Sequence, residues 1–288
     1  MKKYLLPFLF IFSCFCLSSA SVKEIFSHGC VDWTEGKIFI DIKSRQSSGK
    51  ITIKKAYKSA QEDLLKRYYQ KAKRIINGIR IDSDCIIGTE IEKRNVLSLE
   101  VNRMLQETEI RKLEYNIDGT ILLKACFPLY GNSGLASIFY NQKTNSAVMG
   151  NPSYQKTFLF NFTKIPSNSD EFYTGLIIDA RLLNISPALW PKIYDTNNNI
   201  LYGNKINPNI GSIQERGSVI YVYDISEALG LVARIGENPL VIKAVSAAGI
   251  FKTDVLIFEK DAQILRQANN HINFLKSAAV IFVINKKN

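Results

Sequence analysis

The sequence predicts an α+β protein with two small mixed α/β domains, each a mostly antiparallel sheet with helices packed on one face. Three patterns lead to this class. Isoleucines alternate with other residues over 37–43, which is typical of a half-buried strand. Small and apolar residues recur every four positions over 53–76, as on the packing face of an amphipathic helix. The pair Asp118-Gly119 separates two further strand patterns and favours a tight hairpin.

The N-terminus has the features of a bacterial secretory signal. Two lysines precede an apolar stretch, and Ser18 and Ala20 are small residues at the −3 and −1 positions of a cleavage site. We therefore predict a signal peptide over 1–20 and an exported protein, in the periplasm or associated with the outer membrane. One alternative is an uncleaved anchor, which the short apolar run disfavours. Another is a weak lipobox, which would lipidate Cys14 and anchor the chain to a membrane.

The first domain is expected over 31–130. Its strand at 37–43 precedes a helix over 53–76, which Asn77-Gly78 ends. A second helix is predicted over 96–105, and strands are predicted over 110–115 and 120–127. The helices are expected to lie on one face of the sheet.

A linker region is expected over 131–171, where Gly, Asn, Ser, Pro and Gln accumulate around an isolated strand pattern at 158–162. The second domain then covers 172–285. Its expected helices are 225–235 and a helix that begins at Asp261 as N-cap and ends at Leu275. Its expected strands are 176–178, 192–194, 200–202, 219–223, 240–247, 253–258 and 279–284.

The chain is basic. Its formal net charge is +11, which becomes +9 once Lys2 and Lys3 leave with the signal. Such a charge favours association with an anionic membrane surface or an acidic cell-wall polymer, although charges that serve only solubility are an alternative. No block of five or six like charges occurs, so no nucleic-acid partner is expected.

Three cysteines follow the signal: Cys30, Cys85 and Cys126. An odd number argues against a disulfide scaffold. One bridge would be compatible with an oxidising compartment, and Cys30 is the thiol expected to be exposed. Buried free thiols are the other interpretation for Cys85 and Cys126.

The sequence contains no nucleophile elbow, phosphate-binding loop or dinucleotide fingerprint. His28, in a segment expected to be frayed, and His271 have no partners at zinc-ligand spacing. The run from Asp195 to Asn199 imitates the start of a calcium loop, but Ile200 and Ile206 stand where a glycine and a bidentate acid belong. A hairpin turn explains the same residues. We therefore expect no catalytic residue, no cofactor and no metal.

Three polar residues are the candidates for a polar functional site. Asp179 and Arg181 stand two positions apart on one strand and share a face, where they form either a polar site or a structural ion pair. Asp254 lies in another predicted strand. An enzyme assembled from such distant residues would need a deep pocket lined by several titratable groups.

Several segments of the second domain resemble a group of exported bacterial proteins. They are 174–181, 187–189, 191–195, 201–203, 238–244 and 253–255. In that group, a similar domain follows a module related to the outer-membrane lipoprotein family that includes FlgP and the N-terminal part of FlgT. The alanine-rich helix over 56–72 behind a strand looks like that module. The resemblance implies an envelope protein without catalytic residues, which assembles with envelope proteins and with flagellar motor components.

The leading hypothesis is accordingly a non-enzymatic exported envelope protein that acts in assembly or scaffolding, associated with the flagellum and able to form homo-oligomers. The alternative is a periplasmic ligand- or cell-wall-binding module, which the positive charge and the aromatic residues of 130–154 favour. An enzyme with a site assembled only in the fold is the third.

Overall fold

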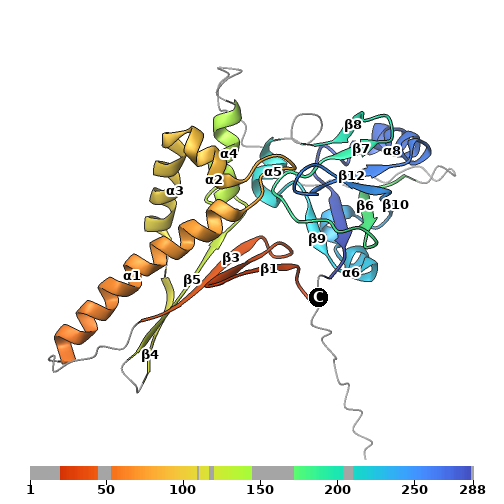
Figure 1. Ribbon diagram of the computed structural model, residues 1–288. Coiled ribbons are helices and arrows are strands. Elements are labelled where there is room, and N and C mark those ends of the chain that lie inside the picture. Colours follow the sequence, from red (N-terminus) through yellow and green to blue (C-terminus); the bar gives the residue numbers. More distant parts are fainter. Residues whose placement is uncertain are drawn as a thin grey trace, which may run out of the picture.

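The computed structural model describes residues 20–44, 53–108, 110–116, 120–144, 172–203 and 210–286, with side chains described except at 53–57, 110–112, 141–144 and 210. The predicted signal peptide, Cys14, the Asp118-Gly119 turn and the strand pattern at 158–162 lie outside the described residues. Figure 1 shows a unit of long helices on a sheet beside a second unit of shorter strands and helices. The predicted α+β class is confirmed.

The first unit is built on a five-stranded antiparallel sheet in the order β1-β2-β3-β5-β4. Its strands are β1 (Lys23–Phe26), β2 (Gly29–Asp32), β3 (Lys37–Lys43), β4 (Ile110–Tyr115) and β5 (Ile121–Pro128). Alternate residues of β3 and β5 are buried, such as Ile38, Ile40 and Leu123. The strands predicted at 37–43, 110–115 and 120–127 are therefore confirmed, as is the antiparallel sheet of this half.

The hairpin of β1 and β2 was not predicted, and the frayed segment expected around His28 is wrong. His28 lies in the turn between the two strands, and its carbonyl accepts the Asp41 backbone N–H at 3.1 Å. Each strand has only four residues, which is the lower limit for a recognisable period-2 pattern. Burial of Val31 and Trp33 by the rest of the chain holds the hairpin in place.

Helices cover one face of this sheet (Figure 1). They are α1 (Ile53–Gly78), α2 (Ile87–Lys93), α3 (Asn95–Glu107) and α4 (Leu135–Thr144). The predicted periodicity of α1 is confirmed, because Leu64, Tyr68 and Ala72 are buried at i+4 spacing. The short helix α2 was not predicted, and α4 forms inside the region expected to be a linker, where Leu135 and Phe139 enter the core.

The second unit contains two four-stranded sheets, in the orders β10-β6-β13-β9 and β11-β12-β7-β8. Their strands are β6 (Gly175–Ala180), β7 (Ile193–Asp195), β8 (Ile200–Tyr202), β9 (Ile220–Val222), β10 (Pro239–Lys243), β11 (Ser246–Ala248), β12 (Asp254–Ile257) and β13 (Val280–Ile284). Every pairing in the first of these sheets is parallel, so the mostly antiparallel sheet predicted for this half is wrong there. β13 is buried along its whole length, as expected for a parallel strand covered on both faces.

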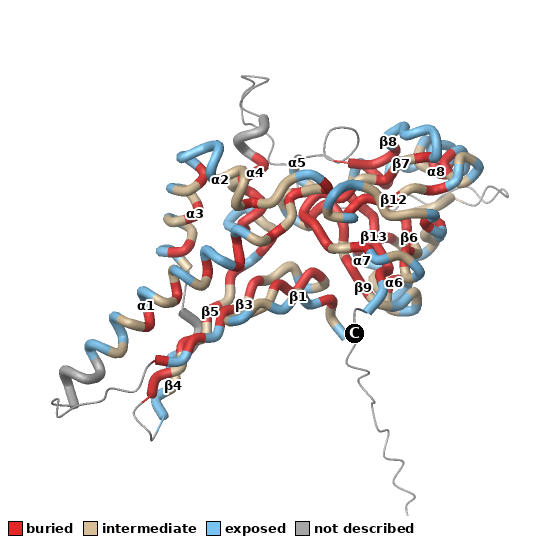
Figure 2. Tube along the Cα trace, in the orientation of Figure 1, coloured by how far each residue is buried: buried red, intermediate tan, exposed pale blue. Residues whose placement is uncertain are grey.

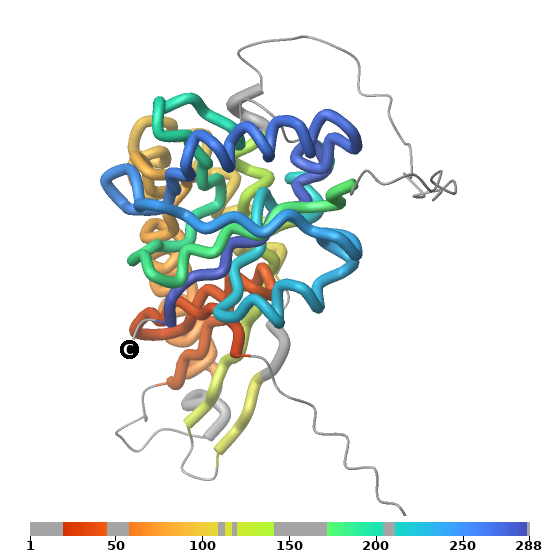
Figure 3. Tube along the Cα trace, turned by 90° about the vertical axis from the view of Figure 1, so that its right-hand side faces the viewer, coloured from red at the N-terminus to blue at the C-terminus, as the bar shows by residue number. Residues whose placement is uncertain are grey.

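Helices lie on both sides of the parallel sheet, which corrects the expected single covered face. The helices of this unit are α5 (Ile210–Arg216), α6 (Ile225–Gly230), α7 (Val232–Ile235) and α8 (Glu259–Ile272). Ile177, Ile281 and Val283 pack against α6 and α7 in one cluster, whereas α8 buries residues in the main core. Figure 3 shows α8 along one side of these strands and α6 on the other.

Several element boundaries in this unit differ from the predictions, three of them in kind. The helix expected over 225–235 divides at Leu231, whose backbone leaves the helical region. The strand expected over 240–247 is two strands, β10 and β11, which join different sheets. α8 begins at Glu259 with Phe258 as N-cap, so Asp261 lies in the first turn and is not the cap.

One hydrophobic core runs through both units. It includes Val22 and Ile38 from the first unit together with Leu176 and Phe282 from the second, and Figure 2 shows buried residues from one unit into the other. Backbone hydrogen bonds also cross between the units. The amides of Leu189 and Trp190 donate to the carbonyls of Arg80 and Ile81 at 3.0 and 2.8 Å. The two units are therefore packed as one body.

Candidate functional site

A cluster of titratable side chains lies where the two units meet. Ser83 and Asp84 come from the loop before α2 and Lys192 from the residue just before β7. Tyr194 lies in the middle of β7, and Asp254 begins β12. We call these five residues the seam cluster. The Lys192 Nζ lies 3.9 Å from Asp254 Oδ2 and 4.0 Å from Asp84 Oδ2, so this amine bridges carboxylates from both units.

Burial sets the charge states within the seam cluster. Asp254 is 1% exposed, and desolvation raises the pKa of its carboxyl although bonds from the Lys192 amide and Ser83 oppose the rise. Desolvation alone would lower the pKa of Lys192, but the nearby acids outweigh it and the pKa is raised. Burial also raises the pKa of the Tyr194 hydroxyl. Lys192 is therefore a fixed cation.

The polar atoms of Asp254 are already engaged. Its Oδ1 accepts the Lys192 backbone N–H at 3.0 Å and the Thr253 hydroxyl at 3.0 Å, and its Oδ2 faces the Lys192 amine. A buried carboxyl beside a cation is an arrangement found at catalytic sites, but structural ion-pair networks perturb pKa values in the same way. These contacts fasten β12 to β7 and the loop at Ser83.

Asp179 and Arg181 form an ion pair, as one of the two interpretations predicted. Arg181 Nε and Nη2 donate to Asp179 Oδ1 and Oδ2, each at 2.9 Å. Hydrogen bonds from Arg181 hold the pKa of Asp179 below its ordinary value. None of the contacts described for Asp254 involves either residue, so the three polar residues do not converge on one site.

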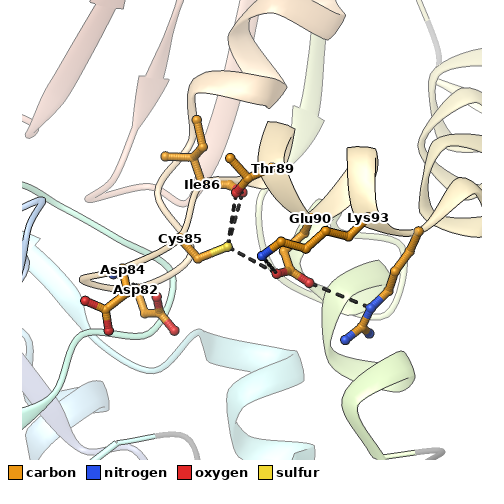
Figure 4. A network of polar contacts seen from close by, with 8 residues as sticks. Asp82, Asp84, Cys85, Ile86, Thr89, Glu90 and Lys93 are labelled. Carbon is orange, nitrogen blue, oxygen red and sulfur yellow. Dashed lines mark hydrogen bonds and ion pairs between the residues drawn. The ribbon is translucent and has the colours of Figure 1, made fainter.

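Figure 4 shows a second polar network around Cys85. The Cys85 thiol lies 3.3 Å from both Thr89 Oγ1 and Glu90 Oε1, and Glu90 also pairs with Lys93 at 3.4 Å. Desolvation raises the pKa of this thiol, and the Glu90 carboxylate adds to the rise. Since a thiolate is the reactive form, this environment favours an unreactive thiol that donates to Glu90.

The calcium-loop interpretation of the run from Asp195 to Asn199 is wrong. Asp195 is fully buried, and its oxygens accept from Asn197 N–H at 2.9 Å, Asn199 N–H at 2.8 Å and Arg266 Nη2 at 2.5 Å. Burial would raise the pKa of Asp195, but these donors outweigh it and lower the pKa to about 2. The carboxylate therefore organises the turn between β7 and β8, with no oxygen left for a cation.

Two cavities also lie between the units. One, of about 260 Å³, is lined by Arg80, Glu24 and apolar residues of both units, and its Arg80–Glu24 pair is 2.6 Å long. The other, of about 240 Å³, lies between Trp33 and Arg216. Asp179, Arg181 and Asp254 line neither cavity.

Two absences concern only the part of the chain that the structure describes. No three His, Cys, Asp or Glu side chains come together there in a way that could hold a metal ion. No described helix is both long and apolar enough to cross a membrane.

Of the seam cluster the sequence patterns singled out only Asp254 and missed Ser83, Asp84, Lys192 and Tyr194. They also missed Arg234, which lies outside that cluster. The only signal for Arg234 was a cation inside the apolar run from Leu231 to Ile235. Its guanidinium is buried and donates to the carbonyls of Arg216, Gly217 and Ser218 at 2.7, 2.9 and 3.0 Å. It thereby satisfies the C-terminal end of α5, where carbonyls lack helical partners.

Comparisons with known proteins concern mainly the second unit. No curated protein matches the chain. A protein-family model does match residues 175–286, from the first residue of β6 to just beyond β13. It leaves out the first sheet, so the resemblance of the first domain to the FlgP and FlgT module stays a prediction. The second unit is similar to the family described as Treponema pallidum Tp0624, second domain.

Proposed function

We propose that this chain is a non-enzymatic, exported envelope protein that acts in assembly or scaffolding. The observation that carries the proposal is the seam cluster: its most buried charged side chains fasten one unit to the other. Lys192 and Asp254 bridge two strands and a loop of the first unit. Polar groups used in this way stabilise one arrangement of two units, which suits a protein that presents surfaces to partners.

Partners among envelope proteins, and association with the flagellar motor, belong to the same proposal. Its support is the resemblance of the first domain to the FlgP and FlgT module. The similarity of the second unit to a Treponema pallidum protein domain fits a bacterial protein but names no partner. Location in the periplasm or at the outer membrane, and formation of homo-oligomers, are proposed with it.

Co-purification of the tagged, exported protein from cross-linked envelopes, followed by mass spectrometry, tests the proposal. We expect reproducible recovery of envelope proteins, including flagellar motor components. A Lys192→Met variant, which removes the bridging cation of the seam, is expected to recover fewer of them, whereas Lys260→Met on the surface of α8 is the control. A monomeric, freely diffusing protein that recovers no partner would refute the assembly role.

A further inference from the structure

Three basic side chains gather along one flank of α1. Arg67, Lys71 and Arg74 stand at i, i+4 and i+7, which places them on one side of the helix within about 10 Å along its axis. Arg67 pairs with Asp63 at 3.6 Å, and its Nη1 donates to the Lys43 carbonyl at 2.5 Å. Among the described residues no acidic partner lies within ion-pair distance of Lys71 or Arg74. We call these three residues the cationic flank.

The positive charges of these three residues repel one another and disfavour further positive charge nearby. Desolvation lowers the pKa of Lys71, and the charges of Arg74 and Arg67 lower it further. The same three residues depress the pKa of His28 in the β1–β2 turn, after a larger effect of its partial burial. Like charges at these spacings destabilise a helix. The helix dipole favours cations only within the last turn, and α1 ends at Gly78, so it does not account for Arg67 and Lys71.

The shape of the surface suits a flat partner. α1 carries eight basic and two acidic residues, and it runs along the length of the first unit in Figure 1. The cationic flank lines neither of the two cavities described between the units. A small anion is usually held in a concave site. A plane of phosphates instead can meet several charged heads on one side of a helix, with the side-chain stems extended.

We infer that the cationic flank of α1 docks the protein on an anionic lipid bilayer through the headgroup phosphates. Each basic residue near such a surface strengthens binding about fivefold, and salt weakens the attraction. This docking goes beyond the proposed assembly role and does not depend on it, because an assembly protein could equally act away from any membrane.

Vesicle co-sedimentation of the chain from Ser21 to Asn288, which contains every described strand and helix, tests the inference. The vesicles are phosphatidylcholine alone, or phosphatidylcholine mixed with phosphatidylglycerol. We expect binding only to the anionic vesicles, weakened by added salt. The variant R67Q/K71Q/R74Q should bind about a hundredfold more weakly, from about fivefold per cation.

A matched variant, K58Q/K66Q/K73Q, removes the same charge from exposed positions elsewhere on α1 and should lose only a small part of the binding. Because Arg67 also holds the Lys43 carbonyl, K71E/R74E repeats the test without that contact, with circular dichroism to verify folding. Equal losses in the flank and matched variants would overturn the inference, as would binding to neutral vesicles. A preference for soluble polyphosphate over vesicles would overturn it too. Co-purification of protein partners is read out separately and is expected to survive in K71E/R74E.

Discussion

Asp195 shows how one buried carboxylate organises a turn. It accepts hydrogen bonds from two turn amides, the Asn199 side chain and Arg266 of α8. The short polar side chains at 195–199 suggested either a cation site or a turn, and the added arginine from α8 decides for the turn. The charge of Asp195 is thus neutralised within the fold.

Replacement of Asp195 by Ala should lower the free energy of unfolding by about 2–3 kcal/mol, since several buried donors lose their acceptor. Chemical denaturation measures this, with Glu107→Ala on the exposed end of α3 as control. The pH dependence follows from the lowered pKa, about 2 in the fold. The stabilisation is complete above the unfolded pKa of about 4 and is lost as pH falls toward 2. Asp195→Asn should make the free energy of unfolding less dependent on pH in this acidic range. An unchanged pH dependence would contradict the lowered pKa of Asp195.

Arg234 is the second residue whose environment leads to a testable prediction. Desolvation lowers the pKa of its guanidinium to about 10, and only backbone carbonyls accept from it among its described hydrogen bonds. Arg234→Met should reduce the free energy of unfolding by about 3 kcal/mol, because the C-terminal carbonyls of α5 lose charged donors. Arg216→Met, at a half-buried position whose guanidinium donates to the Ala233 carbonyl at 2.5 Å, should cost less than about 1 kcal/mol. Similar losses of unfolding free energy in both variants would show that the buried contacts of Arg234 stabilise the fold no more than those of Arg216.

At the scale of elements, the first sheet determines the state of the cysteines. Cys30 pairs in register with Phe39, and Phe39 pairs with Cys126 on its other side. The two thiols therefore stand two strand spacings apart, about 10 Å, which exceeds the reach of a disulfide. Cys85 lies in a separate loop before α2, and no disulfide joins any two of these three cysteines.

We expect the chain from Ser21 to Asn288 to contain three alkylatable thiols after denaturation without reductant. Mass spectrometry before and after reduction measures this, and the two masses should agree. Native-state alkylation should be slow at Cys30 and Cys85, because desolvation raises the pKa of both thiols. Recovery of a Cys30–Cys126 bridge would require a different register of β2, β3 and β5.

At the scale of the whole molecule, the contact between the units depends on a close approach of two backbones. Gly249, in the turn between β11 and β12, has a φ of +81°, and a Cβ there would lie 2.1 Å from the Ser83 Cβ. The Phe251 N–H donates to the Ser83 carbonyl at 3.1 Å beside it. A side chain at this position would separate the loop of the first unit from the second.

Gly249→Ala should therefore lower the melting temperature by several degrees, since about 1–3 kcal/mol is lost to strain and lost contacts. Gly230→Ala is the matched control, because no atom lies within 4 Å of a Cβ built there and its φ is not in the left-handed region. We expect the control to be neutral or slightly stabilising. Equal melting temperatures for both variants would show that this contact contributes little.

The sequence by itself determined the elements whose signal is local. The i+4 repeat from Ala56 to Ala72 gave α1, and the alternation at Ile38, Ile40 and Ile42 gave β3, because burial on one face imposes the period of the backbone on the side chains. The Asp179–Arg181 pair could also be predicted from the sequence, since its two residues are only two positions apart. The proposed export signal rests on the same kind of local pattern.

Only the tertiary structure decided the features whose partners are distant in the chain. The parallel order β10-β6-β13-β9 is invisible in the strands themselves, because a buried apolar run reads the same in either direction. Ser83 meets Asp254 only when the two units pack, and the Arg234 Nη atoms meet their carbonyl acceptors only because α5 ends beside them. The four-residue strands β1 and β2 carry too little pattern alone and form because Val31 and Trp33 are buried by the core.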